Sequence, residues 1–274
     1  MAVTMADISK LRTMTGAGMM DCKNALTESN GDFDKAIEII RKKGQAVAAK
    51  RSDREASEGC VLAAHTGNFS VCVALKCETD FVAKNADFIA LTQSILDVAM
   101  AQKPADLESL LALQINGASI ASLITDRSGI TGEKMELGFY EFVKGEATVS
   151  YIHPGNKLAT IVAFNQASVD LKAARDIAMQ VAAMSPISLN RESVPANIVA
   201  TELEIGRDKA RQEGKPEAML DKIAQGRLNK FYQESTLLEQ AFIKDAKITV
   251  QQYLQQQNAG LTATDFKRVT LNQE

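Results

Sequence analysis

The residues best suited to recognition or chemistry stand together in one stretch, Thr79-Asp80-Phe81-Val82-Ala83-Lys84-Asn85. The stretch follows an apolar run at 71–75 and precedes an amphipathic helical pattern that begins near Ala86, which predicts a strand-to-helix corner. Such corners present side chains outward on a stiff frame. The carboxylate of Asp80 beside the phenyl ring of Phe81 suits a polar contact or a hydrophobic probe. The alternative is that Asp80 caps the helix and Phe81 packs into the core.

No other part of the sequence offers catalytic chemistry. A Walker loop, a dinucleotide fingerprint, a nucleophile elbow and an HExxH motif are all missing. The glycines of Gly16-Ala17-Gly18 follow no buried strand, which favours a helix-helix turn over a phosphate cradle. Asp80 has no second carboxylate at a useful spacing, and His65 and His153 occupy equivalent turns. We therefore expect no enzymatic activity, no catalytic residue and no cofactor.

Composition favours a protein partner or a small ligand. The chain has 274 residues, 46% of them hydrophobic, which is enough for two or three domains with real cores. The 31 Lys and Arg residues balance 34 Asp and Glu residues, so no basic field points to nucleic acid. The first residues lack the features of a secretory signal, and no run approaches membrane-spanning length. We expect a cytoplasmic protein that binds neither nucleic acid nor membranes.

The cysteines are expected to be reduced core residues. Their spacing is irregular and most of them lie in apolar patterns. The four positions are Cys22, Cys60, Cys72 and Cys77. A zinc site or reactive thiol built from Cys60, His65 and Cys77 is the alternative, and the spacing argues against it.

The first fifty residues predict three short helices separated by glycine turns. The helices are expected at about 5–14, 20–28 and 33–43, with Asp32 capping the third and Gly44 ending it. This gives a small three-helix module at 1–44. A polar, Ala-rich linker at 45–58, helical at first and then loose, is expected to let the module move.

The middle of the chain contains an internal repeat. Each copy has a Gly-Asn hairpin turn between apolar strands, a covering helix and a further strand, which predicts two related α+β subdomains with antiparallel sheets. The expected subdomains are 59–145, and 146–188 together with 235–274. In the strand at 135–143, alternation predicts that Met135, Leu137 and Phe139 share a buried face.

The two copies differ at the corner. The second copy has the plain sequence Gln166-Ala167-Ser168-Val169-Asp170 where the first has its Asp-Phe pair. Since the frame forms without Asp80 and Phe81, this comparison favours a functional role for them.

An insertion at 189–234 interrupts the second copy. Two helical segments, 195–211 and 217–232, flank Glu213-Gly214-Lys215-Pro216, a strong helix breaker. The apolar faces of the two arms predict a helical hairpin. The hairpin either meets a partner or a second copy of the chain, or its two arms cover each other.

Residues 11–26, the corner at 79–85 and Gly214-Lys215-Pro216 together resemble the translation elongation factor Ts family, and the likeness runs through nearly the whole chain. The resemblance implies an α+β multidomain fold with a ubiquitin-associated-like (UBA-like) N-terminal three-helix bundle and a coiled-coil hairpin. The hairpin at 195–234 would form a homodimer.

The resemblance also implies a guanine nucleotide exchange factor that promotes GDP release from elongation factor Tu by disturbing its magnesium and phosphate site. The factor would hold no metal of its own and would act on the Mg and GDP bound to its partner. The residues implied at the interface are Thr79, Asp80, Phe81, Val82, Arg12, Met19, Met20, Gly132, His153 and Ile243. One of the two methionines could instead pack in the core. The alternative function is a UBA-like protein-binding adaptor without exchange activity.

The sequence departs from the family pattern in three places. Lys134 follows Gly132-Glu133 where the family often has Asn, and Lys244 follows Phe242-Ile243 where Met is usual. These changes alter the residues beside two of the implied contacts, Gly132 and Ile243. Many family members continue into a further C-terminal helix, whereas this sequence stops at Glu274, so we expect that contact to be absent or replaced.

Overall fold

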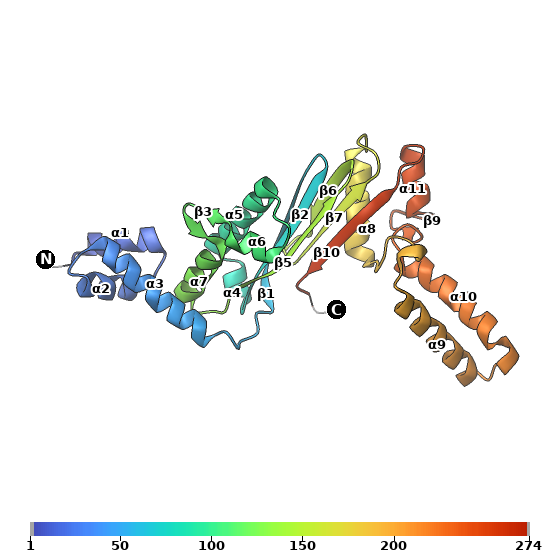
Figure 1. Ribbon diagram of the computed structural model, residues 1–274, viewed down its shortest axis with the longest axis horizontal. Coiled ribbons are helices and arrows are strands. Elements are labelled where there is room, and N and C mark those ends of the chain that lie inside the picture. The colour runs from blue at the N-terminus through green and yellow to red at the C-terminus, as the bar shows by residue number, and fades with distance from the viewer. Residues whose placement is uncertain (1–2, 273–274) are drawn as a thin grey trace. The chain divides into compact units, whose positions relative to one another are not determined.

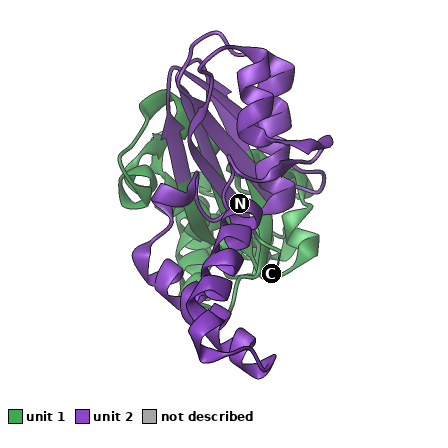
Figure 2. Cartoon of the chain, turned by 90° about the vertical axis from the view of Figure 1, so that its right-hand side faces the viewer, with its two compact units in different colours: residues 1–62, 73–140, 271–274 green, residues 63–72, 141–270 purple. Residues whose placement is uncertain are grey.

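The computed structural model describes residues 3–272 and divides the chain into two compact units. The first unit comprises 1–62, 73–140 and 271–274, and the second comprises 63–72 and 141–270 (Figure 2). The tip of the first predicted hairpin thus groups with the second unit. The smaller modules predicted within these units remain predictions.

Three helices begin the first unit: α1 (Met5–Thr15), α2 (Met19–Glu28) and α3 (Phe33–Lys50). Thr4 and Asp7 form a capping box at the start of α1, and Asp32 caps α3 as predicted. Gly16 ends α1 with a φ of 71°, a conformation that glycine adopts without strain. The buried core of the helices consists of Ile8, Leu11, Ala17, Cys22, Ala25, Leu26 and Ala36.

The predicted end of the third helix at Gly44 is wrong. Helix α3 continues through Gly44 to Lys50, so the helical start of the expected linker belongs to the same helix. Gly44 is buried because α3 packs along α7 (Ile120–Thr131) at this point (Figure 1). Here glycine permits close approach of two helices and does not terminate one.

The rest of the first unit contains further helices and strands, and some of the strands cross the boundary between the two units. Its other helices are α4 (Asp80–Ala83), α5 (Ala86–Gln102) and α6 (Leu107–Ala112). The strands are β1 (Glu58–Thr66), β2 (Phe69–Cys77), β3 (Gln114–Ile115), β4 (Ala118–Ser119) and β5 (Glu136–Lys144), and the larger sheet has the order β1-β2-β5.

Strand β5 breaks the alternation expected of it. Leu137 is buried as predicted, but Phe139 is 39% exposed and Tyr140 is buried in its place. The side chain of Lys76 lies over Gly138, and the Tyr140 hydroxyl donates to the carbonyl of Pro104 at 2.7 Å. That hydrogen bond satisfies the polar end of a buried aromatic residue, which simple alternation cannot anticipate.

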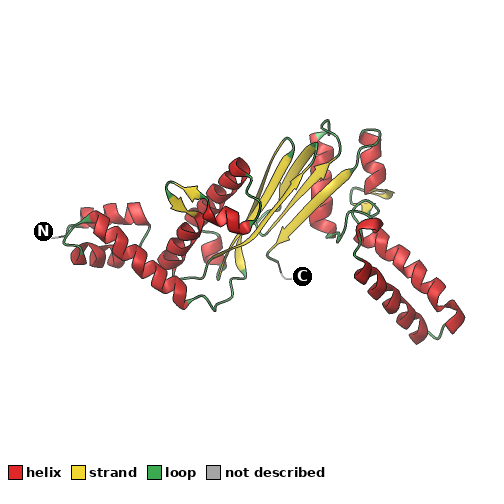
Figure 3. Ribbon diagram, in the orientation of Figure 1, coloured by secondary structure: helices red, strands yellow, loops and turns green. Residues whose placement is uncertain are grey.

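In the second unit, a three-stranded antiparallel sheet has the order β10-β7-β6 (Figure 3). Its strands are β6 (Ala147–Ile152), β7 (Leu158–Phe164) and β10 (Ala263–Thr270), and a small ribbon is formed by β8 (Ala241–Phe242) and β9 (Asp245–Thr249). The helical elements are α8 (Leu171–Met184), η1 (Arg191–Ser193), α9 (Ala196–Gln212), α10 (Glu217–Ser235) and α11 (Val250–Gln257). The fold is therefore mixed α+β, as predicted.

The internal repeat is visible in the topology. In each copy the second hairpin strand is central and the last strand pairs beside it, in the orders β1-β2-β5 and β6-β7-β10. Both hairpin turns need left-handed backbone, at Gly67 (φ 47°) in the first copy and at Gly155 (φ 93°) and Asn156 (φ 54°) in the second.

The predicted helical hairpin is formed by α9 and α10, which pack against each other. Leu220, Ala224, Leu228 and Tyr232 of α10 are buried, and Phe231 packs partly buried beside them. Gly206 lies directly against Ala224, which brings the two helices close together. Among residues 3–272, no helix combines the length and the apolar character needed to cross a membrane.

Candidate functional site

The corner after β2 is a single helical turn, α4, held by caps at both ends. Thr79 has extended backbone, and its hydroxyl oxygen accepts from the amide of Val82 at 3.4 Å. Thr79, and not Asp80, is therefore the N-cap. At the far end, the Asn85 side chain caps α5 by accepting from the amide of Asp87 at 2.9 Å. The corner therefore has a defined backbone between two ordered elements.

Phe81 is 83% exposed at the apex of this turn. The alternative in which Phe81 packs into the core is wrong. Val82 is half-buried and Ala83 is buried, so the turn is anchored by its opposite face. Burying an exposed phenylalanine side chain contributes about 1.5 to 3 kcal/mol of favourable free energy, and a partner that covers Phe81 gains it on binding.

Asp80 lies beside Phe81 and forms an ion pair with Lys84 at 2.6 Å, one helical turn along the chain. The hydrogen bond from Lys84 and the charge of Asp80 raise the pKa of the lysine. The Lys84 side chain is largely exposed and that of Asp80 is half-buried. The corner therefore presents a carboxylate and an aromatic ring together.

Glu133 holds the corner from behind, a role that sequence reasoning missed. Its carboxylate accepts from the amides of Glu78 and Thr79 at 3.1 and 3.0 Å, and from the Thr79 hydroxyl at 2.5 Å. Three donors on one charged acceptor make a strong local clamp. The signal was present in the Gly132-Glu133 pair, but no sequence spacing predicts that this pair meets a segment more than fifty residues earlier.

Glu78 adds a second brace. It accepts from the backbone amide of Lys134 at 2.6 Å and from Arg51, the C-cap residue that follows α3, at 3.2 Å. The bond from Lys134, followed by that from Arg51, lowers the pKa of Glu78. Because Lys134 contributes its backbone amide, the departure from the family residue at this position leaves the brace intact.

Gly132 ends α7 in the left-handed conformation, with a φ of 72°. Its amide donates to the carbonyl of Ser128 at 2.9 Å, and a side chain added at Gly132 would meet open space. Glycine is required here by backbone conformation. The resulting turn directs Glu133 at the corner.

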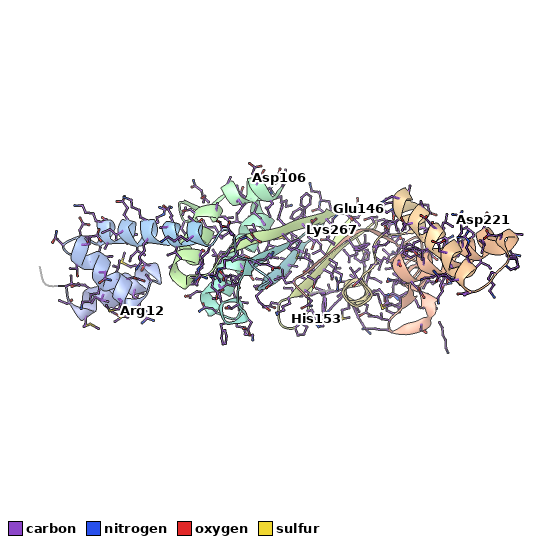
Figure 4. The ribbon with its side chains drawn as sticks, turned by 90° about the horizontal axis from the view of Figure 1, so that it is seen from below. Arg12, Asp106, Glu146, His153, Asp221 and Lys267 are labelled. Carbon is purple, nitrogen blue, oxygen red and sulfur yellow. The ribbon has the colours of Figure 1, made fainter. Side chains whose placement is uncertain are left out.

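Arg12, Met19 and Met20 lie on the surface of the N-terminal helices. Arg12 is exposed on α1 (Figure 4), and the two methionines open α2, 37% and 66% exposed respectively. The alternative in which one methionine packs in the core is wrong. Methionine is adaptable at protein interfaces, so this surface suits a protein partner.

The remaining predicted residues, His153 and Ile243, belong to the second unit. The imidazole Nδ1 of His153 lies 3.0 Å from the hydroxyl of Tyr151, and the ring is exposed. Ile243 is 41% exposed, whereas its neighbour Phe242 is buried.

The departure at Lys244 has a structural role. Its ammonium group pairs at 2.6 Å with Asp176, whose side chain is only 5% exposed. A buried carboxylate needs such a partner, because an unpaired buried charge is costly. Lys244 is therefore engaged within its own unit while Ile243 beside it stays exposed.

The thiol and zinc alternatives find no support in the geometry. All four cysteines are buried, and none of them forms a disulfide. Burial raises the pKa of Cys77 to about 12, which opposes thiolate chemistry at neutral pH. His65 lies 2.9 Å from the hydroxyl of Ser150, and the described residues contain no group of three side chains suited to a metal ion.

Known proteins match this chain over nearly its whole length. A sequence model described as "Elongation factor TS" matches residues 78–273. The chain is 63% identical to an elongation factor Ts of Porphyromonas gingivalis over 273 residues, which cover 99% of each chain. It is 56% identical to that of Azobacteroides pseudotrichonymphae over the full length of both. These matches extend over both units and include the corner, so the chain belongs to the elongation factor Ts family.

Proposed function

We propose that this translation elongation factor is a guanine nucleotide exchange factor that promotes GDP release from elongation factor Tu. The observation that carries the proposal is the exposed phenyl ring of Phe81 on a braced corner. A ring presented in this way can enter a partner without first leaving a core of its own.

The proposed mechanism is a coupling of two binding events. Phe81 wedges between partner side chains near the magnesium ion, and Asp80 brings a further negative charge close to that ion. Because magnesium bridges the nucleotide phosphates to the GTPase, disturbing its surroundings weakens GDP binding. Coupling is reciprocal, so GDP weakens binding of the exchange factor by the same factor.

One wedge is too small to account for exchange by itself. Each tenfold acceleration of release requires about 1.4 kcal/mol of barrier lowering. An acceleration of several decades therefore requires further contacts that hold the wedge in place. The exposed residues outside the corner are suited to making such contacts. The proposed contacts are Arg12, Met19, Met20, Gly132, His153 and Ile243.

The reaction forms and breaks no covalent bond in this mechanism. Magnesium and GDP belong to the partner, and the exchange factor contributes shape and charge. Such a role in translation fits the cytoplasmic location expected from the sequence.

Release of labelled GDP from purified elongation factor Tu tests the proposal. The intact chain should accelerate release, and Phe81→Ala should reduce the acceleration by at least tenfold. Phe139→Ala is a matched control, because it removes another exposed phenyl ring from the same unit. Equal loss in both variants, or no acceleration by the intact chain, would reject the proposal.

We also propose that the α9–α10 hairpin mediates homodimerisation. Each arm keeps an exposed apolar residue, Ile205 at 38% and Met219 at 47%, although the arms cover most of each other's apolar faces. Light scattering at micromolar concentration distinguishes a dimer from a monomer. A monomeric mass at that concentration contradicts this part of the proposal.

The adaptor alternative depends on the same exposed methionines, Met19 and Met20. It requires the chain to bind a ubiquitin-like ligand, and a flat titration of the intact chain with ubiquitin would count against it. Acceleration of GDP release would separately exclude an adaptor without exchange activity.

A further inference from the structure

Helices α3 and α7 meet at two glycines, Gly44 and Gly129, with their backbones almost in contact. A Cβ atom placed on Gly129 would lie 2.0 Å from the Cα of Gly44 and 2.8 Å from its carbonyl oxygen. Ordinary van der Waals contacts of a Cβ begin near 3.4 Å. Even a methyl group at Gly129 therefore requires the two helices to separate.

The crossing is asymmetric. A Cβ atom placed on Gly44 would lie 3.4 Å from the Cα of Gly129 and 3.8 Å from the carbonyl oxygen of Asp126. That is normal packing. A methyl group is therefore tolerated on α3 and excluded on α7, although both positions lie inside helices.

Polar contacts fix the crossing on both sides. Before Gly44 in the sequence, Arg41 reaches α7, where it pairs with Asp126 at 3.5 Å and donates to the hydroxyl of Ser122. Beyond Gly44, Arg51 binds Glu78, which directly precedes the corner. The two arginines are ten positions apart, a span of about 15 Å along the helix axis. Helix α3 is thus held along its length.

Beside the crossing, the N-terminal helices and the rest of the first unit leave a cavity of about 650 Å³. Its lining includes Met14 and Ile40 on one side and Leu123 and Ile130 on the other. The two sides therefore do not merge into a single packed core here. Their relative position depends on the contacts along α3 and on the end of α1, where Gly16 lies beside Arg127 and Ile130 of α7.

Helix α7 also holds the corner, because Glu133, just after the end of the helix, clamps Thr79. We infer that Gly129 is a positioning residue: its contact with Gly44 fixes the N-terminal three-helix module on α7, at a set spacing from the Phe81 corner. The consequence for exchange depends on the function proposed above. A fixed spacing lets both surfaces engage the GTPase without a further ordering cost.

The test compares Gly129→Ala with Gly44→Ala in the full chain. Both changes add one methyl group and raise helix propensity, so they differ mainly in the space available. Spin labels at Lys23→Cys and Gln93→Cys, exposed positions on α2 and α5, report the spacing of module and core in the free protein. Gly129→Ala should lengthen or broaden the measured distance, and Gly44→Ala should leave it unchanged.

In GDP release, Gly129→Ala should raise the half-saturating concentration about tenfold and leave the maximal rate within about twofold, because the corner itself is untouched. Gly44→Ala should change neither quantity more than twofold. Arg41→Ala adds no volume and should raise the half-saturating concentration about threefold, which keeps the inference testable if Gly129→Ala does not fold.

Wild-type spacing in Gly129→Ala, or equal damage by both alanine variants, would overturn the inference. So would a broadened distance without any change in half-saturating concentration, or no effect of Arg41→Ala on either quantity. The distance measurement needs no partner. It therefore decides the role of the glycine contact even if the intact chain proves not to release GDP.

Discussion

Removing the carboxylate of Glu133 should disorder the corner while leaving the fold intact. Glu133→Ala deletes the acceptor of three hydrogen bonds, two from backbone amides and one from the Thr79 hydroxyl. Hydrogen bonds to charged groups contribute about 1.5 to 3 kcal/mol each, and less where water can replace the acceptor. Because Glu133 is only half-buried, we expect a combined local loss of about 2 to 3 kcal/mol.

If the corner must be reordered when it enters the GTPase, this loss of free energy adds to the barrier for GDP release. At about 1.4 kcal/mol per decade, the second-order rate constant for GDP release should fall about 30- to 100-fold. Glu133→Gln keeps an accepting oxygen, so its rate constant should fall less, by about 3- to 10-fold. Glu108→Ala, a change at an exposed glutamate of the same unit, should leave the rate constant unchanged.

Hydrogen exchange provides the structural assay. The amides of Glu78 and Thr79 should lose protection in Glu133→Ala, whereas the amides in the middle of α5 should keep theirs. If the corner is unprotected in the variant but GDP release keeps its wild-type rate, the link between an ordered corner and nucleotide exchange is refuted. Full protection in the variant would refute the clamp itself.

Three further predictions concern stability and reactivity. Glu78→Gln should lower the free energy of unfolding by about 1 kcal/mol near neutral pH. Because the pKa of Glu78 is depressed in the folded protein, the difference in stability between wild type and variant should shrink as the pH falls through that pKa. Urea denaturation from pH 7 to 3 measures this difference. Gly206→Ala should destabilise the hairpin, since its Cβ would lie 3.0 Å from the Cα of Ala224, whereas Gly226→Ala meets open space and should stabilise α10 by up to about 1 kcal/mol in thermal unfolding. Cys77 should react with iodoacetamide at pH 8 at least tenfold more slowly than a free thiol, and urea should abolish the difference.

The elements that depend on local chemistry could be predicted from the sequence. The Gly-Asn turns, the Asp32 cap and the repeated strand patterns each act over a few residues, and the structure contains all of them. Comparison of the two copies also pointed to Phe81, because a structural residue should recur where the architecture recurs. Its exposure agrees with that reasoning.

The errors arose where distant segments decide the outcome. Gly44 was predicted to end a helix because glycine usually does so, but α3 continues through it to Lys50 and packs there against Gly129 of α7. Phe139 was predicted to be buried by alternation, yet the contact of Lys76 with Gly138 and the hydrogen bond of Tyr140 shift the buried position by one residue. The clamp by Glu133 connects segments that no local spacing relates.

The central claim is that Asp80 and Phe81 act on the nucleotide site of elongation factor Tu. The most direct test is the maximal rate of GDP release at saturating concentrations of the Asp80→Ala, Phe81→Ala double variant, with thermal unfolding as a check on its fold. Phe81 is 83% exposed and the Asp80 side chain is 44% exposed, so the fold should be unaffected. We predict that the maximal rate falls by at least two decades. A wild-type maximal rate would contradict the claim.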